Sequence, residues 1–144
     1  MWGMLIGMLS GALMSVQGVF NTGATKQTSM WVTVSFVQAT ALVVCLIAWF
    51  VTGRNGNFAD LIHVQPRYLL LGGAIGAFIT YTVVASMNSI GPARAAMFIV
   101  SAQLLVAYLI ELFGMFGVEK QPFEWRKIFG LVIMIVGVIT FKWK

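Results

Sequence analysis

The 144-residue chain is 60% hydrophobic and only 9% charged, whereas soluble domains carry about 25% charged residues. This composition excludes a soluble globular domain, because too few polar residues remain to cover a surface that faces water. The net charge of +5 does not indicate a nucleic-acid-binding protein, because the nine Lys and Arg residues are scattered among the ends of apolar stretches instead of gathered on one face.

Five apolar stretches make up most of the chain, each near the length of about 20 residues that a helix needs to cross a bilayer. Pro66, Pro92 and Pro122 each stand ahead of an apolar run, where a helix tolerates proline in its first turn. The sequence therefore predicts an all-α membrane protein with one domain over residues 1–144. The five predicted transmembrane helices cover residues 2–21, 30–51, 67–89, 92–114 and 125–141.

The first predicted helix carries small residues on one face. Gly3, Gly7 and Gly11 recur at every fourth position, and Ser15 and Gly18 continue this stripe of small residues, so the backbone of a neighbouring helix can approach closely along this face. In the third predicted helix, Gly72 and Gly76 have the same spacing. We expect these glycines to lie at contacts between helices or between the subunits of a dimer.

A second face of the first helix is polar. Ser10, Met14, Gln17 and Asn21 are spaced as one stripe of an α-helix. Amide side chains are costly when they face lipid, so Gln17 and Asn21 are expected to point inward. Two interpretations stay open for this pair: the amides line a solute cavity, or they join helices by hydrogen bonds.

The fourth predicted helix contains Glu111, the only acidic residue inside an apolar stretch. Removal from water disfavours the charged carboxylate, so a buried Glu111 suits a carrier coupled to protons or cations. The alternative is an interfacial residue that reaches the headgroups or pairs with a basic side chain. Gln103 lies roughly 80° around the same helix, and Gln103, Tyr108 and Tyr81 are further candidates for the wall of a cavity.

Basic residues are nearly balanced between the two sides of the predicted membrane. The N-terminal side has Arg54, Arg67, Lys120, Arg126 and Lys127, and the other side has Lys26, Arg94, Lys142 and Lys144. The orientation of a membrane protein follows the difference in Lys and Arg number between the short loops on its two sides. Five basic residues against four favour neither orientation strongly. One interpretation is insertion in both orientations and pairing with an inverted copy. The other is a single, weakly biased orientation.

An inverted pair of this chain has the architecture of a secondary transporter, in which two inverted halves surround a site at the midplane of the membrane. Arg94 and Glu111 are about 25 Å apart along one helix, too far to pair within a chain. In an inverted dimer, however, Arg94 of one copy comes to the depth of Glu111 in the other. We therefore expect an ion pair between subunits.

Neither catalysis nor a bound cofactor is expected. Cys45 is the only cysteine, which excludes an intrachain disulfide and argues against a cysteine-based metal site. The sequence also has no nucleophile and base pair, metal-ligand cluster or phosphate-binding loop. The chain is therefore predicted not to be an enzyme.

The pattern Gln17-x-x-x-Asn21, followed by Gly91, Gln103-Leu104-Leu105 and Glu111, resembles the half-size, five-span YdcZ branch of the drug/metabolite transporter superfamily. The resemblance covers nearly the whole chain. It implies a multi-pass protein of the bacterial cytoplasmic (inner) membrane, related to transporters of five plus five inverted spans that move small metabolites or drugs. Arg94 departs from the small or polar residue expected there. Unlike the four-span small multidrug transporters, this chain has no acid in its first span.

The predicted function is transport of a small organic solute by alternating access in an antiparallel homodimer equivalent to a ten-helix transporter. One alternative replaces the second copy with an oppositely oriented homologue. The other is a membrane scaffold or assembly subunit that transports nothing, in which the glycine faces bind other membrane proteins and the polar residues only join helices. This last interpretation predicts a dry centre.

Overall fold

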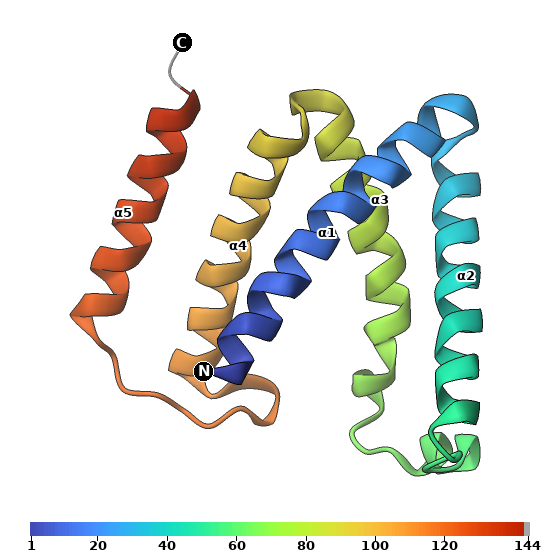
Figure 1. Ribbon diagram of the computed structural model, residues 1–144. Coiled ribbons are helices and arrows are strands. Elements are labelled where there is room, and N and C mark those ends of the chain that lie inside the picture. The colour runs from blue at the N-terminus through green and yellow to red at the C-terminus, as the bar shows by residue number, and fades with distance from the viewer. Residues whose placement is uncertain (143–144) are drawn as a thin grey trace. The chain divides into compact units, whose positions relative to one another are not determined.

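The computed structural model describes residues 1–142, and these residues form helices and no strand (Figure 1). The α-helices are α1 (Trp2–Gln27), α2 (Met30–Val51), α3 (Gly72–Ile90), α4 (Pro92–Phe113) and α5 (Trp125–Lys142). Short 3₁₀ helices in the connections are η1 (Phe58–His63), η2 (Arg67–Leu71) and η3 (Met115–Gly117). The all-helical prediction is confirmed for this range. Lys144, which entered the charge balance, lies outside the described residues.

Within residues 1–142, four helical segments are long and apolar enough to cross a membrane: α1, α2, the continuous segment Arg67–Ile90 and α4. They correspond to the first four predicted spans. The fifth predicted span, α5, has 18 residues, of which Arg126, Lys127 and Lys142 are basic. Its uninterrupted apolar stretch is therefore only residues 128–141, and a fifth membrane crossing stays a prediction.

The first helix does not end at Asn21 as predicted but continues to Gln27. In this extension the Thr22 hydroxyl donates a hydrogen bond to the Gly18 carbonyl one turn back at 2.7 Å, so the polar group is satisfied within the helix. Ser29 then begins α2, where its side chain accepts a hydrogen bond from the backbone N–H of Val32 at 3.4 Å. The polar end of α1 is thus helical and not part of a loop.

The helices fall into two compact units, Met1–Asn88 and Ser89–Lys144. In the first unit, α1 crosses α3 obliquely and α2 runs alongside α3 (Figure 1). In the second unit, α4 and α5 lie side by side and run in opposite directions (Figure 1). Gly91, with φ +83°, precedes α4, and Pro92 is its first residue.

Little of the chain is buried. Its accessible surface is 11253 Å², whereas a soluble folded chain of this mass exposes roughly 7300 Å². Large apolar side chains, phenylalanine among them, are exposed on every α-helix. Apolar surface of this extent is covered in the native setting by lipid or by another protein.

Candidate functional site

A small polar cavity lies in the first unit between α1 and α3. Its volume is about 50 Å³, and its lining includes the polar side chains of Gln17, Asn21 and Thr80. Met14, Gly18, Ile79 and Val83 complete the lining. Of the predicted polar stripe, Met14, Gln17 and Asn21 line this cavity; Asn21 is buried, whereas Gln17 is exposed.

The crossing of α1 and α3 depends on Gly18. A Cβ atom at this position would lie 2.5 Å from both Sδ and Cε of Met87 and 3.5 Å from a methyl carbon of Val83. The two helices reach this separation because position 18 has no side chain. Gln17 and Asn21 flank Gly18 on α1, so the close crossing brings both amides to the cavity.

The glycines predicted to mediate packing are not in close contact within the chain. A Cβ atom added at Gly3, Gly7, Gly11 or Gly72 would meet nothing within 4 Å, and one at Gly76 would meet only the Gln38 side chain at 4.0 Å. Their proposed role between subunits therefore stays a prediction. Of the stripe of small residues on α1, Gly18 is the glycine whose added Cβ atom would meet another helix in the described part of the chain.

The amides of Gln17 and Asn21 have no protein partner. Asn21 is buried, with 8% of its surface exposed, and within residues 1–142 no hydrogen bond engages either side chain. Neither amide therefore joins two helices in this chain. Each supplies two N–H donors and one carbonyl acceptor, so both are available to a bound molecule or to water.

The hydrogen bond that does join helices involves residues that the sequence analysis did not single out. Gln38 on α2 donates from Nε2 to the Thr80 hydroxyl at 3.3 Å, and Thr80 donates to the Gly76 carbonyl at 2.9 Å. Gln38 is the only amide side chain in α2, the same kind of signal that identified Gln17. Tyr81, predicted for the cavity wall, packs instead against Trp31 of α2 with ring centroids 4.8 Å apart.

A longer groove runs along one face of α1 and shares Met14, Gln17 and Asn21 with the cavity. Its volume is about 530 Å³, and its lining contains the whole predicted polar stripe, Ser10 included. Apolar side chains complete the lining: Ile6, Leu9, Leu13, Val16 and Phe20. Neither the groove nor the cavity is lined by a charged residue.

The second unit contains a charged cluster where α4 ends and α5 begins. The Lys127 ammonium lies 3.6 Å from Oε2 of Glu111 and 4.0 Å from Oε1 of Glu124. It also lies 5.7 Å from the centroid of the Tyr108 ring. Two interpretations of Glu111 were left open, and the structure of the single chain contains the ion pair with a basic side chain.

The connection between α4 and α5 positions Lys127. Gly114 ends α4 with φ +65°, and a Cβ atom there would lie 3.1 Å from Cβ of Lys120. The backbone N–H of Gln121 donates to the Glu111 carbonyl at 2.9 Å, which satisfies one of the last carbonyls of the helix. The chain is thus held against the end of α4 shortly before α5 begins.

Other predicted site residues are spread along α4. Tyr108 is buried, and its hydroxyl has no hydrogen-bond partner in the described part of the chain. Gln103 and Arg94 are exposed. The structure therefore groups Glu111 and Tyr108 around Lys127, and leaves Gln103 and Arg94 outside that cluster.

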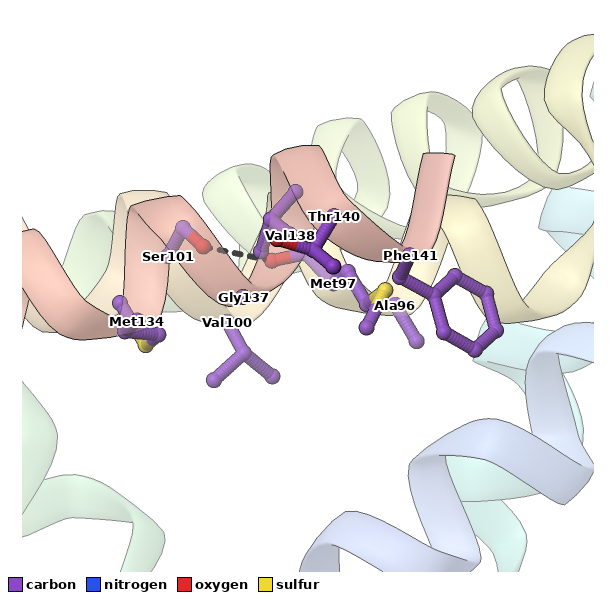
Figure 2. A pocket seen from close by; sticks show the side chains of 9 residues that line it. All are labelled: Ala96, Met97, Val100, Ser101, Met134, Gly137, Val138, Thr140 and Phe141. Carbon is purple, nitrogen blue, oxygen red and sulfur yellow. Dashed lines mark hydrogen bonds between the residues drawn. The ribbon is translucent and has the colours of Figure 1, made fainter. Parts of the chain in front are cut away.

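An apolar groove of about 740 Å³ lies between α4 and α5 (Figure 2). Its residues are Ala96, Met97, Val100, Ser101, Met134, Gly137, Val138, Thr140 and Phe141. The Ser101 hydroxyl donates to the Met97 carbonyl and the Thr140 hydroxyl to the Val136 carbonyl, both at 2.8 Å. Because both hydroxyls are bonded within their own helices, the groove offers mainly apolar surface and is a poor site for a polar solute.

Long apolar helices with uncommitted amides between them are features of membrane transport proteins. Comparison with known families gives the same class: residues 2–140 match the family described as "Putative inner membrane exporter, YdcZ". The chain belongs to this family of membrane transport proteins, and the resemblance found in the sequence is confirmed. No curated protein and no solved structure matches it.

Proposed function

We propose that the protein exports a small organic solute across the bacterial inner membrane by alternating access. The observation that carries this proposal is the buried amide of Asn21, which lines a cavity together with the exposed Gln17, neither of them with a protein partner among residues 1–142. Buried polar groups in proteins are nearly always hydrogen-bonded. Unbonded amides between membrane-crossing helices are therefore suited to a transient partner, namely the solute or water.

The working unit in this proposal is an antiparallel pair of chains with α5 as the fifth span. The near balance of Lys and Arg between the two sides supports insertion in both orientations. The apolar residues 128–141 are flanked by Arg126 and Lys127 before them and Lys142 after them. Long basic side chains can reach the headgroups from both ends of a short span.

Glu111 serves as the coupling residue in this mechanism. Its carboxylate lies near Lys127, so a proton or another cation that binds Glu111 competes with an ammonium of the same chain. Release of Lys127 would loosen the contact between the end of α4 and the start of α5. A local protonation would in this way change the packing of two helices.

Export is tested by measuring metabolites in the growth medium of cells that overproduce the protein. We expect at least one small molecule to accumulate outside the cells. Asn21→Leu should abolish this accumulation, because it removes the buried amide and fills the cavity. Val19→Leu is the matched control, since Val19 lies on α1 outside the linings of the cavity and the groove.

A scaffold protein is the alternative, and the open glycine face of α1 is the observation that favours it. A scaffold would leave the medium unchanged, and Asn21→Leu would then affect only the abundance of the protein. If export requires co-expression of a homologue, the second half of the transporter is that homologue and not a second copy.

A further inference from the structure

We infer that the exported solute is an uncharged molecule that both donates and accepts hydrogen bonds, such as one bearing hydroxyl or carboxamide groups. This inference rests on the proposed function and names the substrate class of the site on α1. Three observations carry it: the absence of charge around the site, the hydrogen-bonding groups that are free there, and the sizes of the two hollows.

The first observation is electrostatic. None of the residues that line the cavity or the groove is charged, and the first charged residue along α1 is Lys26, beyond both linings. A charged solute moved from water into such an apolar setting loses several kcal/mol unless a counter-ion or fixed donors replace its hydration. No counter-ion is available among the residues that line this site.

Glu111 does not change this conclusion within its own chain. It is the only acidic residue inside a membrane-crossing helix, and the Lys127 ammonium lies 3.6 Å from its carboxylate. Glu124 lies 4.0 Å from the same ammonium, so this cluster of two carboxylates and one ammonium is not neutral, but none of its residues lines the cavity or the groove. An uncharged solute is therefore compatible with a separate coupling role for Glu111.

The second observation is the hydrogen-bonding capacity of the site. The amides of Gln17 and Asn21 together present N–H donors and carbonyl acceptors, and neither is used by the described chain. Asn21 is more than nine-tenths buried and lines both hollows. Hydroxyl and carboxamide groups satisfy an amide in both directions, whereas an ammonium can only donate and a carboxylate can only accept.

The third observation is the size of the two hollows. The groove of about 530 Å³ is within the range of roughly 300–1,000 Å³ that is typical of small-molecule sites. The adjoining cavity of about 50 Å³ exceeds the roughly 30 Å³ that one water occupies. All residues that line the groove belong to α1, so the body of a metabolite would lie along an open face of this helix, and the cavity fits one polar group of it beside Asn21.

The inference is tested with methanethiosulfonate reagents of matched size that carry a neutral hydroxyethyl, a cationic trimethylammonioethyl or an anionic sulfonatoethyl group. The protein is the full chain in liposomes with Cys45→Ser and a single new cysteine, Gln17→Cys. Each rate is divided by the rate of the same reagent at the exposed loop position, Asn55→Cys. Val19→Cys reports any reaction that occurs through lipid.

The neutral reagent should react at Gln17→Cys at least about tenfold faster, after normalisation, than either charged reagent, and faster than it reacts at Val19→Cys. Adding Asn21→Asp should move the preference to the cationic reagent, which shows that the assay senses charge at this site. Equal normalised rates, or a charged reagent reacting fastest without Asn21→Asp, would overturn the inference and leave the transporter proposal standing. No reaction at Gln17→Cys, or equal neutral rates at positions 17 and 19, would indicate a dry centre and overturn the proposed function as well.

Discussion

The Lys127 ammonium at the start of α5 lies 3.6 Å from the Glu111 carboxylate near the end of α4. Each charge alone is at the unfavourable end of its helix, because helix C-termini favour cations and N-termini favour anions. The pair offsets both disadvantages. Glu111 therefore has a partner in its own chain. Lys127 competes for Glu111 with Arg94 of a second copy, the partner that was predicted from the sequence.

Exchanging the two charges tests which partner Glu111 has. Glu111→Lys alone should lower the free energy of unfolding by about 1 kcal/mol or less, because both side chains are partly exposed. The double variant Glu111→Lys with Lys127→Glu should restore it, since each new charge also suits its helix end. Thermal unfolding in detergent measures this. Recovery by Arg94→Glu in place of Lys127→Glu would show that the ion pair is between subunits.

Position 18 on α1 should be the least tolerant glycine of that helix. Gly18→Ala places a methyl group against the end of the flexible Met87 side chain, which must shift, and should cost about 1 kcal/mol of unfolding free energy. The cost of Gly18→Ala should be smaller in a Met87→Ala background, which is itself less stable because Met87 is buried. Gly7→Ala is the control, because its added Cβ meets nothing within 4 Å. A larger loss at position 7 than at position 18 would contradict the observed crossing of α1 and α3.

The open glycine face of α1 should matter for assembly and not for folding. Gly7→Leu adds a large side chain where the chain itself leaves room, so the unfolding temperature of the monomer should change little. If this face packs against a second copy, crosslinking between copies should fall severalfold. Unchanged crosslinking with Gly7→Leu would place the subunit contact elsewhere.

Sequence periodicity predicted the helices well and the contacts between them poorly. Hydrophobic length and proline positions located four apolar spans, because the bilayer dictates how long a crossing helix must be. The spacing of Gln17 and Asn21 predicted one polar stripe, and both residues line the cavity, but only Asn21 is buried, whereas Gln17 is exposed. Gly18 and Gly7 look alike in sequence, but only Gly18 meets another helix, since the crossing angle decides which glycine is used.

Charged partners were also hard to predict. Lys127 was counted only for membrane orientation. It and Glu111 belong to different predicted helices, so their spacing in sequence does not indicate a contact. The turn that brings the two together depends on Gly114 and on the backbone bond from Gln121 to Glu111. Such loop geometry has no periodic signature. The contact made by Gln38, by contrast, could have been predicted, because a single amide side chain in an apolar helix is expected to form a hydrogen bond with another helix.

Insertion in both orientations predicts mixed labelling in cells. Single cysteines at Gln27 and Asn55 lie at opposite ends of α2 in a Cys45→Ser background. A membrane-impermeant thiol reagent should label each site in about half of the molecules if the two orientations are equally populated. Complete labelling at one site and none at the other would establish a single orientation, and an oppositely oriented partner would then be required.

The turn at Gly114 should control the contact between Lys127 and Glu111. Gly114→Ala must adopt a positive φ and crowd Lys120, which should cost about 1–2 kcal/mol of unfolding free energy. In this background, Glu111→Gln should have a smaller effect than in the native chain, because the ion pair is already displaced. Gly130→Ala in α5 is the control, since its Cβ meets nothing within 4 Å. Equal effects of Glu111→Gln in both backgrounds would show that the turn does not position Lys127.

The helices of this chain differ widely in length, and the surrounding lipid must accommodate the difference. The 26 residues of α1 extend about 39 Å, whereas the apolar residues 128–141 of α5 extend only about 21 Å. Hydrocarbon about 30 Å thick accommodates α1, because its residues 21–27 are mostly polar and can lie outside the hydrocarbon, but it exceeds the apolar length of α5, which therefore requires local thinning. The protein is therefore expected to sense bilayer thickness, so that the acyl-chain length of the host lipid sets how readily its helices rearrange.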